Sequence, residues 1–356
     1  GMGASGEGQN VAHQAKKMDK ASLKQFRDRF DIPVTDEQID SGDLPYLTFA
    51  PDSEEYKYLH ARREALGGYL PQRKPTQEVL EVPELSAFET QLKSSGDREF
   101  STTMAFVRIL STLLKDKKIG KRVVPIVPDE SRTFGMEGMF RQYGIWNPKG
   151  QQYTPQDKDQ LMFYKESVDG QILQEGINEP GAMADWIAAA TSYANSDFAM
   201  IPFYIYYSMF GFQRIGDIAW AAGDAQAQGF LLGATAGRTT LNGEGLQHQD
   251  GHSHILANTI PNCISYDPCF GYELAVIVHD GLKRMYVNQE RVFYYLTVMN
   301  ENYEHPAMPQ GVEEGMKRGM YLLEEDEKAT VQLLGSGVIL REVIKAAKIL
   351  REEYQI

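Results

Sequence analysis

The chain has 356 residues, 42% of them hydrophobic and 24% charged, which is typical of globular domains and excludes a disordered or disulfide-rich class of protein. At about 100–200 residues per domain, this length predicts two or three domains. A formal net charge of −13 at pH 7 argues against nucleic acid as a partner, because phosphate binding needs a basic surface. The longest apolar stretch, residues 198–211, is shorter than the roughly 20 residues that span a bilayer, so no membrane partner is expected.

Cysteine usage indicates a reducing compartment. The chain contains only Cys263 and Cys269, which cannot form a four-cysteine zinc site. No secretory signal is visible in the first residues. We therefore expect a cytoplasmic protein.

The first part of the chain is predicted to contain little regular structure. Residues 1–8 include the sequence pattern G-x-G-x-x-G, but no strand precedes it, so a loop is favoured over a dinucleotide-binding site. Residues 11–30 have a helical and basic pattern, which indicates either a solvated helix face or contact with an acidic partner or anionic substrate. Residues 31–99 are rich in Pro, Asp, Glu and Gly, with a short helix at residues 54–66, and are interpreted as a linker.

Regular structure begins at Ser101, an N-cap residue that precedes apolar residues at helical spacing. Strands are predicted at residues 123–127, 200–207 and 292–298, and helices at residues 182–193 and 272–282. Because these strands are apolar throughout and alternate with helices, the pattern predicts an α/β fold with a parallel sheet covered on both faces. Ligands of such sheets bind beyond the carboxyl ends of the strands, which points to Glu130 and to residues 207–214.

The last part of the chain has the pattern of a further β-α unit. Residues 331–335 are predicted to form a strand, and a helix follows to the end of the chain. One strand and one helix cannot bury their own apolar faces. This unit is therefore expected to be truncated, and the chain to be a fragment.

Two candidate sites are a carboxylate at the start of a predicted helix and a group of histidines that could bind a metal. Glu179 stands just before Pro-Gly and an apolar helix, where it is either a functional carboxylate or a structural acid of the first helical turn. His248, His252 and His254 are close enough in sequence to ligate a metal. The alternative for the three histidines is a polar, hydrogen-bonded loop.

Two further candidates follow predicted strands. Residues 203–212 form an aromatic run that is mostly strand core, but its polar continuation at residues 213–214 indicates a functional loop. Asp129 and Glu130 form an acidic pair at the end of the strand at residues 123–127. A solvated turn is the alternative for that pair. Each of the four candidates lies after a strand of the predicted sheet or before a helix that covers it.

Taken together, these segments resemble thiamin-diphosphate enzymes, and closely the homodimeric type of pyruvate dehydrogenase decarboxylating component. The matching segments are residues 129–138, 172–179, 201–217, 237–254 and 261–268, together with residues 10–14 and 331–337. The resemblance spans essentially the whole chain. It implies a three-layer αβα domain of the transketolase-like, pyrimidine-binding type, built on a parallel sheet.

The resemblance also implies a division of the chain into four parts. Residues 1–30 would be the end of the diphosphate-binding domain with a mobile active-site loop, and residues 31–99 a linker. Residues 100–325 would be the pyrimidine-binding domain, and residues 326–356 the truncated start of a C-terminal domain.

The activity implied is oxidative decarboxylation of pyruvate with transfer of the acetyl group to the lipoyl domain of dihydrolipoyl acetyltransferase. The implied assembly is a homodimer with its active site at the subunit interface, and the chain alone is expected to be inactive or nearly so. The alternatives are ketol transfer of the transketolase type, a metal-dependent hydrolase that uses His248, His252 and His254, and a piece that only binds partners.

The resemblance assigns cofactor-binding residues. Glu179 matches the glutamate that contacts N1′ of the cofactor's aminopyrimidine, where a buried carboxyl group can share a proton and help to activate the thiazolium ring. Ile177 matches the bulky residue that bends the cofactor, and Phe210 matches the aromatic residue that packs on its pyrimidine. Asp129 is counted with these cofactor-binding residues.

Further residues are assigned to catalysis. Tyr207 and His248 match substrate contacts, and Glu130 is counted as catalytic. His13, with Glu7, matches a mobile loop that closes over the site and acts in reductive acetylation of the lipoyl group.

The magnesium motif of the family is missing from this chain. Thiamin-diphosphate enzymes hold Mg²⁺ with a Gly-Asp-Gly motif and a later Asn, because this ion prefers oxygen ligands. The Gly-Asp pairs at residues 216–217 and 223–224 are not that motif. The resemblance therefore implies that the Mg²⁺ and diphosphate ligands lie outside this chain.

Overall fold

The computed structural model describes residues 6–14, 17–69, 78–128, 131–156, 164–237 and 245–356. The chain divides into two compact units, residues 1–71 (unit 1) and residues 72–356 (unit 2), and each is described by itself. Among the described residues, no helix combines the length and the apolar character needed to cross a membrane.

Unit 1 contains short helices held by ion pairs. Its elements are the 3₁₀ helix η2 (Asn10–Gln14) and the α-helices α1 (Lys20–Arg29), α2 (Asp36–Ser41) and α3 (Glu54–Ala65). Of the helix expected over residues 11–30, residues 20–29 are confirmed as α1, residues 11–14 lie in the 3₁₀ helix η2, and residues 17–19 are not helical. The Asp19 carboxylate accepts the N–H of Ser22 at 2.7 Å and caps the beginning of α1. Lys24 lies 3.2 Å from Asp36 and 2.9 Å from Asp40. Part of the basic face of α1 is therefore neutralised by acids of α2.

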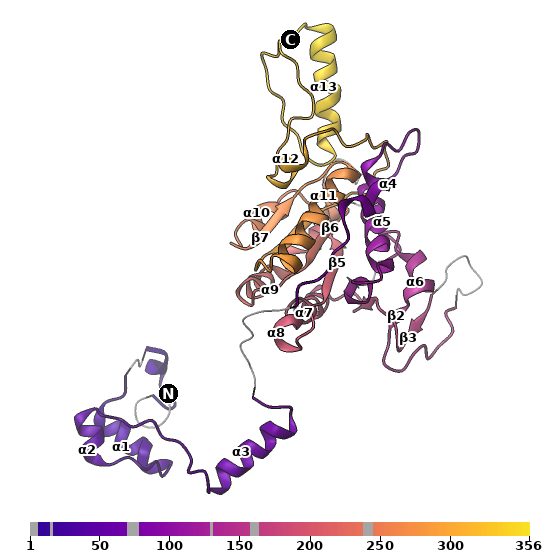
Figure 1. Ribbon diagram of the computed structural model, residues 1–356. Coiled ribbons are helices and arrows are strands. Elements are labelled where there is room, and N and C mark those ends of the chain that lie inside the picture. Colours follow the sequence, from indigo (N-terminus) through magenta and orange to yellow (C-terminus); the bar gives the residue numbers. More distant parts are fainter. Residues whose placement is uncertain (1–5, 15–16, 70–77, 129–130, 157–163, 238–244) are drawn as a thin grey trace. The chain divides into compact units, whose positions relative to one another are not determined.

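Unit 2 is built on a six-stranded parallel sheet (Figure 1). Its strands are β1 (Val123–Val127), β4 (Leu173–Gln174), β5 (Ile201–Tyr207), β6 (Phe230–Ala234), β7 (Cys263–Tyr266) and β8 (Phe293–Thr297). Their order is β4-β1-β5-β6-β8-β7, and each neighbouring pair is parallel. The predicted parallel sheet is confirmed. We did not predict β4, β6 and β7, since runs of two to five residues carry too little periodicity to separate a strand from a buried helix.

Both faces of the sheet are covered, as predicted. Side chains of β5 alternate, so that Phe203 packs with α5 (Thr102–Lys115) and α11 (Gly271–Leu282), whereas Tyr204 packs with α7 (Glu179–Ala190) and α9 (Phe212–Asp224). Figure 1 shows the sheet between these two helix layers. The apolar character of the strands follows from this double burial.

The remaining elements complete unit 2. They are η3 (Leu85–Phe88), α4 (Glu89–Leu92), η4 (Gly120–Arg122), α6 (Glu137–Tyr143), α8 (Ser192–Asn195), η5 (Ser208–Phe210), η6 (Leu246–His248), α10 (Ser253–Ala257), the π-helix η7 (Lys283–Val287), α12 (Glu313–Lys317) and α13 (Ile339–Glu353), with a small parallel sheet of β2 (Ile145–Trp146) and β3 (Glu166–Ser167). Ser101 caps α5 as predicted, accepting the N–H of Met104 at 3.1 Å. Helix α7 begins at Glu179 rather than at residue 182, because Asn178 caps it through the N–H of Gly181.

The strand predicted at residues 331–335 is wrong. These residues form neither a helix nor a strand, and no strand of the described chain pairs with them. The helix after them is confirmed as α13. Its Arg341 lies 2.8 Å from Glu301 and over the ring of Tyr303, so α13 is attached to the segment after β8.

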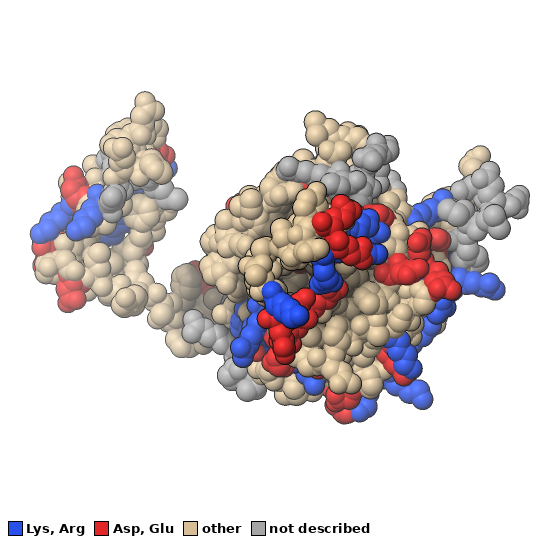
Figure 2. All heavy atoms as spheres, turned by 90° about the horizontal axis from the view of Figure 1, so that it is seen from above, with Lys and Arg blue, Asp and Glu red and all other residues tan. Residues whose placement is uncertain are grey.

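Charged side chains of both signs are mixed on the surface. Figure 2 shows Asp and Glu side chains beside Lys and Arg side chains on the visible face of unit 2. Several charged side chains of unit 2 form ion pairs within one helix, such as Lys317 with Glu313 at 2.7 Å. Exposed pairs of this kind contribute little to stability, about 0–1 kcal/mol each.

A buried histidine joins three segments of unit 2. Nδ1 of His305 accepts the N–H of Gly271 at 3.0 Å, and Nε2 donates to the carbonyl of Phe100 at 2.8 Å, which defines the neutral tautomer. The ring stacks on Phe100 and Tyr303 with centroid distances of 4.1 and 4.8 Å. Burial lowers the pKa of His305, and the nearby Arg108 and Arg341 act in the same direction.

We expect His305 to make the stability of the chain depend on pH. Because its pKa is lower in the folded chain than the ordinary value of 6.5, its contribution is complete above about pH 6.5 and is lost as the pH falls below that value. Unfolding free energies from urea titrations between about pH 5 and pH 8 measure this slope, which is at most about 1.4 kcal/mol per pH unit for one group. His305→Gln keeps one acceptor and one donor but does not titrate, so its slope should be smaller; equal slopes would contradict the assignment.

Candidate active site

The predicted site residues lie beyond the carboxyl ends of neighbouring strands. Glu179 follows β4, Tyr207 ends β5, Phe210 lies in η5 just after it, and His248 lies in η6 after β6. Because the strands are parallel, these ends meet at one edge of the sheet. The prediction that these segments lie at one edge of a parallel sheet is confirmed.

Glu179 is a buried carboxylate with an arginine partner. The residue is 5% exposed, and Nη1 of Arg214 lies 2.7 Å from each of its two carboxylate oxygens. Tyr204 donates a hydrogen bond to its carbonyl oxygen at 3.3 Å. Sequence reasoning named Arg214 only as part of a loop end. It lies in the first turn of α9, and no sequence signal pairs it with an acid that is 35 positions away.

Three aromatic rings pack against one another beside this ion pair. We call Tyr207, Phe210 and His248 the aromatic cluster; its centroid distances are 5.2 Å from Tyr207 to His248, 5.3 Å from Phe210 to His248 and 6.0 Å from Tyr207 to Phe210. The guanidinium carbon of Arg214 lies 4.3 Å from the centroid of Phe210. Glu179 is thus joined to the aromatic cluster through Arg214.

The loop after β1 also lies at this edge of the sheet, where it contacts Tyr207. Tyr207 donates from its hydroxyl to Oγ1 of Thr133 at 3.1 Å, and its ring meets Phe134 at a centroid distance of 5.4 Å. Sequence reasoning did not select Thr133. Asp129 and Glu130, which were predicted in this loop, lie outside the described residues.

The other predicted residues have different surroundings. Ile177 is 77% exposed in the loop that leads into α7. His13 is exposed in η2 of unit 1, and Glu7 lies 2.5 Å from Arg29 in the same unit.

The three histidines of the metal alternative do not converge. Whereas His248 belongs to the aromatic cluster, His252 contacts the side-chain amide of Gln213 at 2.7 Å and His254 contacts the hydroxyl of Thr297 at 3.0 Å. Among the described residues, no group of three or more His, Cys, Asp or Glu could hold a metal ion. His248 lies in η6 and His254 in α10, and the separate partners of the three histidines do not support the hydrolase alternative.

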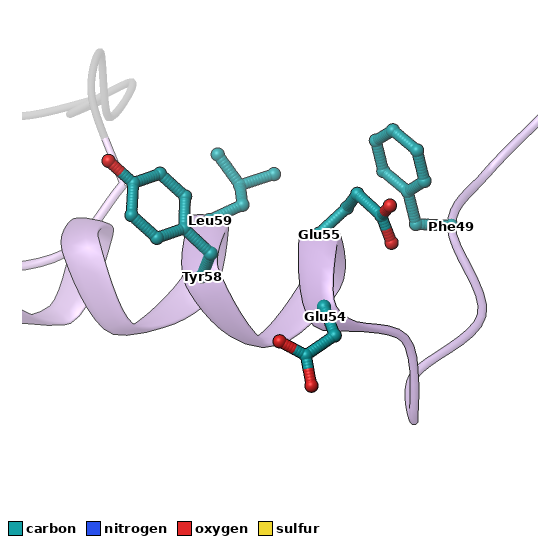
Figure 3. A pocket seen from close by; sticks show the side chains of 5 residues that line it. All are labelled: Phe49, Glu54, Glu55, Tyr58 and Leu59. Atoms are coloured by element: carbon teal, nitrogen blue, oxygen red, sulfur yellow. The ribbon is translucent and has the colours of Figure 1, made fainter.

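An open hollow on unit 1 is separate from these residues. It is lined by Phe49, Glu54, Glu55, Tyr58 and Leu59, along the beginning of α3 (Figure 3). None of the predicted site residues lines it.

The edge of the sheet is suited to a planar nitrogen heterocycle. Such a ring needs an aromatic or apolar wall for its face and a carboxylate for a protonated ring nitrogen. Arg214, a planar cation, already makes both contacts, because it lies over Phe210 and binds both oxygens of Glu179. An imidazole and a phenol, from His248 and Tyr207, lie next to this wall and can donate or accept protons.

Comparisons with known proteins show the family to which the chain belongs. Residues 80–306 match the family described as pyruvate dehydrogenase E1 component middle domain. The chain is 64% identical to the pyruvate dehydrogenase E1 component of Cupriavidus necator, 62% to that of Pseudomonas aeruginosa and 61% to that of Escherichia coli. These matches cover 99–100% of this chain and 40% of each relative, so the chain spans two fifths of the length of those relatives.

Solved structures share the fold at low sequence identity. Transketolase from Campylobacter jejuni is 16% identical with a TM-score of 0.60, over 94% of this chain and 46% of that chain. Transketolase from Leishmania mexicana is 17% identical with a TM-score of 0.55, over 75% of this chain and 37% of that chain. The three-layer α/β fold is therefore transketolase-like, as predicted.

The ion pair between Glu179 and Arg214 predicts that the free energy of unfolding falls when Arg214 is replaced. Arg214→Met leaves a buried carboxylate without its strongest partner, so we expect the free energy of unfolding to fall by about 1–3 kcal/mol. In a Glu179→Gln background the same change should cost clearly less, because the carboxylate is then absent. Urea unfolding of the parent and the three variants at neutral pH measures this coupling. Additive effects would show that the two side chains do not depend on each other.

Proposed function

The chain belongs to the family of the pyruvate dehydrogenase E1 component, and we propose that it forms the pyrimidine-binding part of a thiamin-diphosphate-dependent pyruvate dehydrogenase. The parent enzyme decarboxylates pyruvate oxidatively and passes the acetyl group to a lipoyl group. The observation that carries this proposal is the buried carboxylate of Glu179 beside the aromatic wall of Phe210, linked by Arg214.

The residues present fit an aminopyrimidine. Arg214 makes a stacked contact with Phe210 and hydrogen bonds with Glu179, and a protonated aminopyrimidine requires the same two kinds of contact. In the proposed complex, Glu179 holds a proton at N1′ of that ring, and Phe210 and the exposed Ile177 contact the cofactor. When bound, thiamin diphosphate supplies a nucleophilic carbon and accepts the electrons released by decarboxylation.

The aromatic cluster is proposed to serve the substrate. His248 and Tyr207 lie in ring contact at 5.2 Å, and both carry groups that can hydrogen-bond to the carboxylate or ketone of pyruvate. Thr133 orients the Tyr207 hydroxyl. Glu130 as a catalytic residue and Asp129 as a cofactor contact remain part of this proposal.

We propose the same parts for the chain as the resemblance implies. Residues 1–30 end the diphosphate-binding domain and carry a loop with His13 and Glu7 that closes over the site and serves acetyl transfer. Residues 31–99 are the linker, residues 100–325 bind the pyrimidine, and residues 326–356 begin the C-terminal domain. Ligands of Mg²⁺ and of the diphosphate come from the portion of the relatives that this chain does not span.

The proposed partners are the lipoyl domain of dihydrolipoyl acetyltransferase and a second copy of the enzyme. Large apolar side chains are exposed near the site residues in sequence: Ile177 by 77%, Leu246 by 79% and Ile255 by 68%. Covering such side chains favours association, which supports a homodimer with the site at the interface. Two buried free cysteines, Cys263 and Cys269, support a reducing, cytoplasmic location.

The role of Glu179 is tested in the full-length parent enzyme with thiamin diphosphate and Mg²⁺. Glu179→Gln should slow hydrogen–deuterium exchange at C2 of the thiazolium by about 10²-fold or more, and it should weaken cofactor binding. Nuclear magnetic resonance of quenched samples measures the exchange. Glu175→Gln, the same change in the same loop, is the matched control and should leave exchange near the parental rate. Parental exchange in Glu179→Gln would reject Glu179 as the activating residue.

The role of His13 is tested by separating two reactions of the parent enzyme. His13→Ala should keep the decarboxylation rate, measured with an artificial electron acceptor, but should depress acetylation of an isolated lipoyl domain by at least about tenfold. Mass spectrometry of the lipoyl domain gives the second rate. Equal loss of both rates would contradict a role in acetyl transfer, and an enzyme without lipoyl acetylation would indicate ketol transfer instead.

A further inference from the structure

A buried aspartate without a proposed catalytic role lies two positions after His248. Asp250 is 4% exposed, and its Oδ1 accepts the N–H groups of His252 and Ser253 at 3.1 and 3.2 Å. These bonds fix the turn between η6 and α10. Oδ2 accepts a hydrogen bond from the hydroxyl of Ser208, on the segment that follows β5.

The bond to Ser208 connects two loops that carry the aromatic cluster. Ser208 stands between Tyr207 and Phe210, and Asp250 stands just after His248 on the other loop. The hydroxyl of Tyr295, from β8, lies 3.2 Å from Oγ of Ser208 and is a second hydrogen-bond partner of this side chain. The link therefore joins the loops within one or two residues of the three rings.

A glycine in the neighbouring strand permits the close approach of Ser208 and Tyr295. A Cβ on Gly233 of β6 would lie 2.5 Å from the Tyr295 hydroxyl and 2.8 Å from Oγ of Ser208. Because Gly233 has no side chain, these two hydroxyl groups can lie close to the backbone of β6.

Burial opposes the charge on Asp250. The hydrogen bonds from Ser208, Ser253 and His252 outweigh burial, so the pKa of this carboxyl lies below its usual value. A charged acceptor in a buried position makes strong, directional bonds.

We propose that Asp250 is a positioning residue that holds His248 against Tyr207 and Phe210 by its bond to Ser208. Asp250 does not contact the reacting atoms in this account, and it acts on the substrate only through His248. The inference rests on the proposed function, because it assigns a purpose to the geometry of His248. It goes beyond that function because it identifies the hydrogen bond between Ser208 and Asp250 as the contact that positions His248.

The chain offers a matched control for the local part of the role. Asp116 accepts the N–H groups of Lys118 and Ile119 at 2.7 and 2.9 Å, the same turn pattern as Asp250. It stands at the C-cap of α5, before β1, whereas Asp250 lies at the carboxyl edge of the sheet. Asp116→Ala therefore removes an equivalent turn without touching the aromatic cluster.

The test compares Asp250→Ala, His248→Ala, the double variant and Asp116→Ala in the full-length holoenzyme. Asp250→Ala should lower kcat/KM for pyruvate by about 10²-fold, because small displacements of a reacting group cost that much. Exchange at C2 of the cofactor should stay near the parental rate, since it depends on Glu179. The double variant should be no slower than His248→Ala, because Asp250 acts through His248. Asp116→Ala should keep the parental kcat/KM.

Two kinetic results would overturn the inference. Additive losses in the double variant would mean that Asp250 acts independently of His248. A loss of C2 exchange equal to the loss of turnover would mean that Asp250→Ala damages the fold in general. Ser208→Ala, which keeps the turn of Asp250 and removes the link between the loops, provides a second variant if Asp250→Ala does not fold, and the same outcomes are expected.

Hydrogen–deuterium exchange separates this inference from the proposed function. Asp250→Ala should speed amide exchange at residues 245–256 in the parent enzyme, whereas Asp116→Ala should not. If the parent enzyme turns over no pyruvate, the proposed function fails and this measurement still tests the link. Unchanged exchange at residues 245–256 in both Asp250→Ala and Ser208→Ala would overturn the link itself.

Discussion

The site depends on keeping the charge of Glu179 in a nearly buried position. A carboxylate removed from water is costly unless it is paired and hydrogen-bonded, and Arg214 supplies that partner from another helix. Because Arg214 also lies over Phe210, the pair connects the start of α7 with the segment after β5. The ion pair therefore holds a strong hydrogen-bond acceptor beside an aromatic wall, and a planar ligand that contacts both would take over the contacts that Arg214 makes in this structure.

The parallel sheet explains why residues from distant segments meet. Each strand leads its following segment to the same edge, so Thr133, Glu179, Tyr207 and His248 lie in one region although they belong to four separate segments of the chain. Helices on both faces make the strands rigid, and the loops can then differ without loss of the core. Contacts between loops, such as those of Asp250, are needed because a strand positions only the first residues beyond its end.

Sequence reasoning identified the site residues unequally. Glu179, His248 and the aromatic run at residues 203–212 were selected from their positions in the predicted fold, and the resemblance to a known family then assigned roles to Glu179, Tyr207, Phe210 and His248. The structure brings these four residues together at one edge of the sheet. Arg214 was noticed only as part of a polar loop end, since nothing in a sequence pairs an arginine with a distant acid. The three histidines looked equivalent by spacing, but only His248 joins the aromatic cluster, because His252 and His254 have other hydrogen-bond partners.

Local patterns determined the α/β class, the main strands and the helix start at Ser101. Residues close together in the chain are sufficient to show that both faces of a strand are apolar and that Ser101 caps α5. Local patterns failed for the short strands and for residues 331–335, whose conformation depends on whether a pairing strand is present. The partners of Glu179 and Asp250 were decided only by tertiary structure. A buried charge is stabilised by groups that lie near it in space, and these come from separate loops and helices.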